Sequence, residues 1–195
     1  MTEKIYKQLC ESLGKRGGLY PGMDIPEFYS LAEELFTSEE AAVYIAIPQG
    51  YNPPAAIAGN MGKKEEDVAK ILEEMAYKGL CTAGKMGDTT FYGAPPFVPG
   101  IFEFQFMRGT STEKDVRIAG LIRGYKKAID KTRGPVKMTF PLNRVIPVNK
   151  TIKAENRIHT YNQVKTYIEK YDPISVSKCF CRHEAKLIDP QGHLQ

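Results

Sequence analysis

Residues 53–80 read PPAAIAGNMGKKEEDVAKILEEMAYKGL, and this stretch decides the fold more than any other. Two prolines open a short apolar segment that Gly62 ends, because proline is tolerated in the first turn of a helix and glycine commonly follows the last. Within 65–78, apolar side chains then recur at positions 68, 71, 72 and 75, the spacing of one helix face. The stretch predicts a short helix, a turn and a longer helix.

The segments on either side complete a recognisable order of elements. Thr37 and Glu40 stand at the spacing of a capping box, which predicts a helix that begins after Thr37. Two strand-like runs, 80–86 and 89–92, flank a tight-turn signal after the longer helix. Helix, short helix, turn, longer helix and β-hairpin is the order of a winged helix-turn-helix, and residues 37–94 resemble that superfamily.

Further helices are predicted before and after this region. Residues 2–14 place apolar side chains at helical spacing and end in glycines, and a second helix is expected from Pro26 to Phe36. The link 94–100 carries three prolines, which remove amide donors, so the main domain boundary is placed there. Four aromatic side chains in and after the link are expected to pack between the two halves of the chain: Phe97, Phe102, Phe104 and Phe106.

The C-terminal half is predicted to mix helices and short strands. Residues 101–106 alternate apolar and polar side chains, which indicates a half-buried strand or an extended docking segment. Capping boxes at 110–113 and 160–163 each open a helix. Two strand-like runs are expected as well, at 144–148 and 174–176.

The predicted fold class is therefore α+β, a winged helix-turn-helix domain plus a small C-terminal α+β region. We expect an N-terminal helical segment at 1–36, the winged helix at 37–94, and the C-terminal region at 101–195.

The composition narrows the class of protein. A chain of 195 residues, 42% hydrophobic and 26% charged, falls within the globular range. No apolar run reaches the roughly 18 residues of a membrane span, and the N-terminus is polar. Four cysteines in a chain of this length are unlike a small secreted disulfide domain. We therefore expect a cytoplasmic protein that is neither exported nor membrane-spanning.

Soft metal ligands gather in one place, the sequence Cys179-Phe180-Cys181-Arg182-His183. Cysteine thiolates and imidazole bind zinc or iron–sulfur clusters, so Cys179, Cys181 and His183 are the candidate metal ligands. A cluster normally needs four cysteine ligands and structural zinc needs four from cysteine and histidine, so further ligands must come from elsewhere. The alternative interpretation is that the two cysteines only pack at the start of a short helix.

At this motif the chain resembles the winged-helix and ferredoxin fusion proteins of anaerobic microbes. In that family a helix-turn-helix region is followed by a C-x-C-R motif and then by a ferredoxin-type 4Fe-4S iron–sulfur domain. The resemblance covers 37–195 in layout and rests chiefly on PPFVPGIFEFQFMRG at 95–109 and SVSKCFCRHEAKL at 175–187.

The chain departs from the family pattern after this motif, because the C-x2-C-x2-C-x3-C run that holds a cubane cluster is missing. We therefore expect either the part N-terminal to the ferredoxin domain or a variant that lost its redox centre. The resemblance implies a cluster in the full-length protein, and a redox partner protein or the chain's own ferredoxin domain as partner. It also implies a winged helix that serves protein contacts in an electron-transfer protein. Such a protein would be a component of an oxidoreductase rather than a self-contained enzyme.

A DNA-binding transcriptional regulator with a metal-sensing or redox-sensing Cys-x-Cys motif is the alternative. Its phosphate contacts would come from four lysines: Lys63, Lys64, Lys70 and Lys85. Residues 63–78 also hold five acids, which oppose binding to a polyanion unless they turn away from it. The same residues hold no Arg or Asn to read base edges. A third interpretation is a structural fragment that binds no metal.

No catalytic residues are predicted, because no nucleophile pairing, Walker loop or dinucleotide-binding glycine motif occurs. Cys10 and Cys81 are expected to be packing residues. Six basic residues cluster between 117 and 133: Arg117, Arg123, Lys126, Lys127, Lys131 and Arg133. They predict either a solvated helix face or a docking surface for an acidic ferredoxin or partner protein.

Overall fold

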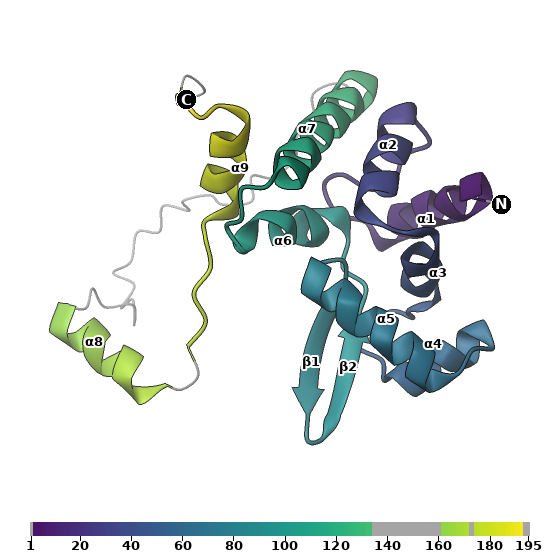
Figure 1. Cartoon of the computed structure of the whole chain (residues 1–195), viewed down its shortest axis with the longest axis horizontal. Helices are drawn as coiled ribbons and strands as arrows, with labels where there is room; N and C mark the ends of the chain where they lie inside the picture. Colours follow the sequence, from purple (N-terminus) through teal and green to yellow (C-terminus); the bar gives the residue numbers. More distant parts are fainter. Residues whose placement is uncertain (1, 134–160, 172–173, 193–195) are drawn as a thin grey trace, which may run out of the picture. The chain divides into compact units, whose positions relative to one another are not determined.

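The computed structural model describes residues 2–133, 161–171 and 174–192. They fall into two compact units, the first made of 2–133 and 178–192, the second of 161–171 and 174–177. The described residues are mostly helical, with one two-stranded antiparallel sheet (Figure 1). The predicted α+β class is confirmed at this level. No helix among the described residues combines the length and apolar character that crossing a membrane requires.

Two N-terminal helices form as predicted. Helix α1 spans Thr2–Arg16 and is followed by two glycines with positive φ angles. Helix α2 spans Pro26–Leu35, with proline in its first turn and its apolar face buried. The Tyr6 hydroxyl of α1 donates a hydrogen bond of 2.8 Å to the Phe36 carbonyl at the end of α2, which ties the two helices together.

Residues 37–93 show the predicted order of elements. Helices α3 (Ser38–Ala46), α4 (Pro54–Met61) and α5 (Glu65–Lys78) precede strands β1 (Thr82–Met86) and β2 (Thr89–Gly93). The capping box at the start of α3 is confirmed, because the Thr37 hydroxyl accepts from the Glu40 amide at 3.2 Å. The Glu40 carboxylate accepts from the Thr37 amide at 2.9 Å.

The turn out of α5 depends on a glycine. Gly79 has φ of +74°, a conformation that side-chain-bearing residues rarely adopt. A Cβ atom at this position would also lie 2.7 Å from Cβ of Phe104. The strands that follow pair antiparallel from Thr82 opposite Gly93 to Met86 opposite Thr89.

One apolar core extends from α1 to the residues after the hairpin, and Phe97 lies inside it. The Phe97 ring stacks on Phe102 at 4.6 Å between centroids and packs against Phe28 and Tyr125 at 5.9 Å each. The predicted packing of the aromatic run is confirmed for Phe97, Phe102 and Phe106, which are all buried. The division of the chain at 36/37 and 94–101 stays a prediction, but the described residues on both sides of each boundary share this core.

The predicted strand or extended segment at 101–106 is wrong. An irregular turn, η1 (Phe97–Ile101), leads into helix α6 (Phe102–Met107). The apolar–polar alternation suggested a strand. However, Phe102 and Phe106 are also four residues apart, and this spacing puts both on the buried face of a helix. The Glu103 carboxylate accepts a hydrogen bond of 2.7 Å from the Gly100 amide and so holds the start of α6.

Two details of the later elements also differ from prediction. Helix α7 (Glu113–Arg133) begins with a capping box formed by Thr112 and Asp115, two residues later than the predicted box at 110–113. The Asp115 carboxylate accepts from the Thr112 amide, and the Thr112 hydroxyl accepts from the Asp115 amide. Residues 174–176, predicted as a strand, have no strand structure. The predicted run at 144–148 and Thr160 lie outside the described residues.

The last two helices belong to different units. Helix α8 (Tyr161–Lys170) lies in the second unit and carries a surface ion pair of 3.6 Å between Lys165 and Glu169. Helix α9 (Phe180–Ile188) lies in the first unit, where it packs on α6 and α7 (Figure 1).

We expect Phe97→Ala to lower the free energy of unfolding of the first unit by about 3 to 5 kcal/mol, because it removes a fully buried aromatic side chain. Leu19→Ala is the control, since the Leu19 side chain is 52% exposed and its loss should change stability by less than about 0.5 kcal/mol. Urea denaturation of both variants measures the effect. Equal stability of the two variants would contradict a core that includes the link.

Candidate functional site

The C-x-C motif lies at the beginning of α9. Cys179 is the N-cap residue and has extended backbone angles, and Cys181 is the second residue of the helix. Both side chains are exposed, whereas Cys10 and Cys81 are buried. The motif therefore presents two thiols at the surface of the first unit.

His183 lies one turn further along the same helix. Its Nε2 atom is 2.7 Å from the Thr110 carbonyl oxygen, so this nitrogen carries the ring proton and donates it. Nδ1 is then the ring nitrogen with a free lone pair. Histidine ligands of metals usually donate their other ring N–H to a carbonyl or a carboxylate in this way.

The three predicted metal ligands do not form a complete site. No three His, Cys, Asp or Glu side chains come together to hold a metal ion within the described ranges. The helix brings Cys179, Cys181 and His183 to one end of α9, but they do not converge on a shared point. Two thiols and one imidazole are suitable donors for a metal that binds thiolates, but they are fewer than the four ligands that such a metal normally takes.

Three contacts around the motif attach α9 to its neighbours. The Lys178 amide donates to the Met107 carbonyl at 2.9 Å, directly before the first cysteine. The Arg123 guanidinium of α7 bonds to Glu184 in the middle of α9, at 2.9 Å from Nε to Oε1 and 3.5 Å from Nη2 to Oε2. The third contact is the His183 bond to the loop between α6 and α7.

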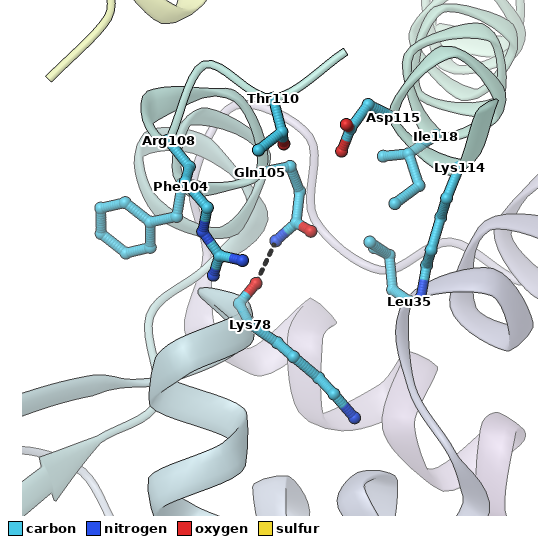
Figure 2. A pocket seen from close by; sticks show the side chains of 9 residues that line it. All are labelled: Leu35, Lys78, Phe104, Gln105, Arg108, Thr110, Lys114, Asp115 and Ile118. Carbon is cyan, nitrogen blue, oxygen red and sulfur yellow. Dashed lines mark hydrogen bonds between the residues drawn. The ribbon is translucent and has the colours of Figure 1, made fainter. Parts of the chain in front are cut away.

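Figure 2 shows a pocket between the ends of α5 and α6 and the start of α7, which includes Thr110 in its wall. Two of its polar side chains bond to backbone carbonyls at the end of α5. The Gln105 amide donates to the Lys78 carbonyl at 3.1 Å, and the Arg108 guanidinium donates to the Tyr77 carbonyl while lying over the Tyr77 ring. These groups satisfy the last carbonyls of α5.

Two further groups in this pocket are also occupied. The Lys78 ammonium pairs with the buried Glu40 carboxylate at 2.6 Å. Burial raises the pKa of Asp115, but hydrogen bonds from the Thr112 amide and hydroxyl outweigh it and hold the pKa below its usual value. Four polar side chains of the pocket wall, those of Lys78, Gln105, Arg108 and Asp115, therefore take part in helix capping or ion pairing.

The prediction for the remaining cysteines is confirmed, because both are packing residues. Burial raises the pKa of the Cys10 thiol to about 11, and nearby Asp24 and Glu11 add to the effect. Burial also raises the pKa of the Cys81 thiol to about 12, and Glu40 contributes. Neither holds much thiolate at neutral pH, so both are poor nucleophiles and poor metal ligands.

All four lysines of the alternative DNA-binding interpretation are exposed. Lys64 occupies the N-cap position of α5 without a side-chain capping bond, Lys70 lies on the exposed side of α5 and Lys85 lies on β1. Lys63 forms an ion pair of 2.8 Å with Glu39. The five acids of α5 are exposed as well, so no basic surface free of carboxylates forms along this helix: Glu65, Glu66, Asp67, Glu73 and Glu74.

The basic run of α7 is divided between structural and solvated roles. Arg117 pairs with Glu34 at 3.1 Å, and Arg123 pairs with Glu184. The Lys126 ammonium lies 5.7 Å from the ring centroids of Tyr20 and Phe102. The last three members are exposed toward the end of the helix, and none of them forms an ion pair within the described part of the chain: Lys127, Lys131 and Arg133. Sequence reasoning missed the role of Arg123, because no local pattern links it to a carboxylate 61 residues away.

The chain matches no protein-family profile, no curated protein and no solved structure.

We expect two thiols of the native protein to react at once with a disulfide reagent at pH 8, and the other two to react only after denaturation. The physical reason is exposure together with the raised pKa of Cys10 and Cys81. The C179S variant should lose one fast equivalent, and C10A should lose none. Four fast thiols in the native wild type, or a fast equivalent lost in C10A, would contradict the assignment.

Proposed function

We propose that the chain is part of an iron–sulfur electron-transfer protein, in which Cys179 and Cys181 are two of the ligands of a 4Fe-4S cluster. The observation that carries the proposal is the exposure of both cysteines at the start of a docked helix, in contrast to the two buried cysteines. A cysteine pair with only a packing role would be expected inside the core, where free cysteine is usually found.

The proposal requires ligands beyond the described residues. A cubane cluster is normally held by four thiolates, so two cysteines supply half of its shell. The other ligands would come from a ferredoxin domain of a longer protein or from a partner protein. A bound cluster would supply one-electron transfer, while the residues of this chain hold and orient two of its ligands. His183 is a further candidate ligand through Nδ1, because its Nε2 is already committed to Thr110.

We further propose that residues 37–94 form a winged helix-turn-helix that serves protein contacts. The order of α3, α4, α5 and the hairpin supports this. A β-bridge between Asn52 and Tyr92, formed by two backbone hydrogen bonds, also supports it, because it places the segment before α4 beside strand β2. The acids on α5 favour a protein partner over the dense phosphates of a nucleic acid.

DNA binding with a metal-sensing or redox-sensing Cys-x-Cys motif is a second candidate, because Lys64, Lys70 and Lys85 stand exposed on the elements that would face a duplex. A shift of duplex DNA that weakens steeply with salt, and that is lost when these three lysines are changed to Gln, would favour this candidate over the first.

We expect the anaerobically purified chain to bind iron after reconstitution with ferrous iron, sulfide and an excess of a small thiol whose thiolates take the remaining ligand positions, and to develop thiolate-to-iron charge-transfer absorption. C179S and C181S should each lose most of this iron, because each removes one of two thiolate ligands. C10A is the matched control and should bind as the wild type does, since Cys10 is buried. Iron analysis after gel filtration measures retention.

Two results would count against a cysteine-held cluster. The first is a wild-type protein that retains no iron and shows no charge-transfer band. The second is retention in C179S and C181S equal to the wild type.

A further inference from the structure

We propose that the groove between helices α1 and α2 docks a basic segment of a partner protein, in which lysine or arginine side chains are mixed with apolar ones. The two helices contact each other in the first unit (Figure 1). The groove has a volume of about 740 Å³, which is within the range of sites that hold a ligand. Its lining includes no residue of α9, so the inference does not depend on the proposed metal-binding function.

Half of the groove lining is apolar. It consists of the rings of Tyr6 and Tyr29, together with Ile25 and Pro26 at the start of α2. The Tyr6 hydroxyl donates to the Phe36 carbonyl and the Tyr29 hydroxyl donates to Asp24, so both hydroxyls already have an acceptor. The groove therefore offers ring and aliphatic surface, which is the usual lining of a site that holds a partner.

The polar part of the lining is acidic. Three carboxylates, Glu3, Asp24 and Glu33, line the groove against one ammonium, that of Lys7. This local excess of negative charge occurs in a chain whose net charge is +4. None of the three carboxylates forms an ion pair with another residue that the structure describes. Their charges are complementary to a partner that carries cations.

The two tyrosine hydroxyls respond to this negative charge. The hydrogen bond to Asp24 is the main cause that raises the pKa of Tyr29 to about 12, and burial and the charges of Asp24 and Glu3 add to it. Burial raises the pKa of Tyr6, and the charge of Glu33 contributes. The carboxylates therefore act at the aromatic surface of the groove as well as in the solvent around it.

Apolar rings beside carboxylates match the two parts of a lysine or arginine side chain. Its methylene stem packs on an apolar surface while its charged head stays near water and acidic groups. The head is also attracted to the face of an aromatic ring. Three carboxylates can pair with more than one cation, and Ile25 and Pro26 add surface for apolar side chains. A peptide segment supplies both several cations and apolar groups, whereas a small amine supplies only the cations.

The test is isothermal titration calorimetry of the whole chain with a six-residue peptide that alternates lysine and phenylalanine. The triple variant E3Q/D24N/E33Q removes the three carboxylates of the groove and keeps the size of their side chains. We expect it to bind the peptide about 10-fold more weakly than the wild type, because each exposed ion pair contributes little and three such contributions add. Circular dichroism checks that each variant keeps the helical content of the wild type.

The chain offers two matched controls. One triple variant neutralises three exposed carboxylates of α5 and should bind the peptide as the wild type does: E65Q/E66Q/E73Q. The second control concerns the opposite change. K7E adds negative charge to the groove and should tighten binding about 3-fold, while K4E makes the same change on α1 outside the groove lining and should tighten it less. K7E decides the question by itself if the groove triple variant does not fold.

Three results would overturn the inference. The first is absence of peptide binding by the wild type. The second is equal weakening in the α5 variant, or equal tightening in K4E and K7E, because the peptide would then follow net charge and not the groove. The third is equal affinity for spermine or for a peptide in which glycine replaces phenylalanine, because the apolar surface would then make no contribution.

Discussion

The packing of Phe97 between Phe28, Phe102 and Tyr125 is the constraint on which the rest of the first unit depends. These rings come from α2, the link after the hairpin, α6 and α7, so each element fixes the others. The Tyr125 hydroxyl adds a hydrogen bond of 2.6 Å to the Pro21 carbonyl, which ties α7 to the segment between α1 and α2. Since α9 packs on α6 and α7, the position of the exposed cysteines follows from this aromatic cluster.

Local signals in the sequence predicted most helices and the hairpin. The capping box at Thr37, the prolines at the start of α2 and α4, and the left-handed glycine after α5 are each determined within a few residues. The segment 101–106 was predicted wrongly because the sequence FEFQF fits both the apolar–polar alternation of a strand and the i, i+4 apolar spacing of a helix. Only packing against the core decides between the two structures. The pairing of Arg123 with Glu184 could not be predicted, since it joins residues far apart in the chain.

The candidate site was found by residue type and not by geometry. The sequence identified the C-x-C-R-H motif and separated it correctly from Cys10 and Cys81, because those two lie among apolar residues at helical or strand spacing. It could not show that His183 commits Nε2 to Thr110, nor that the Lys178 amide directly before the motif bonds to Met107. These features depend on the loop between α6 and α7, whose sequence predicted a helix cap but no contact with α9.

The electrostatics of α5 bear on how the molecule meets its partners. Its first turn holds three acids, which suit the positive end of the helix dipole, and two more acids follow on the exposed side. A helix of this charge is better matched to a protein surface with basic groups than to a phosphate backbone. The fold of 37–93 alone does not decide this question, because one fold serves many functions. The charge pattern of α5 is the observation that supports the proposal of protein contacts.

The central claim is that the exposed pair of thiols is part of a metal coordination shell. X-ray absorption at the iron edge of the anaerobically prepared protein tests it most directly, because it reports the atoms bound to iron. We expect sulfur neighbours at the distance of iron–thiolate bonds, reduced in number when Cys179 and Cys181 are both changed to Ser. Iron surrounded only by oxygen and nitrogen, or a sulfur shell that is the same in the double variant, would contradict it.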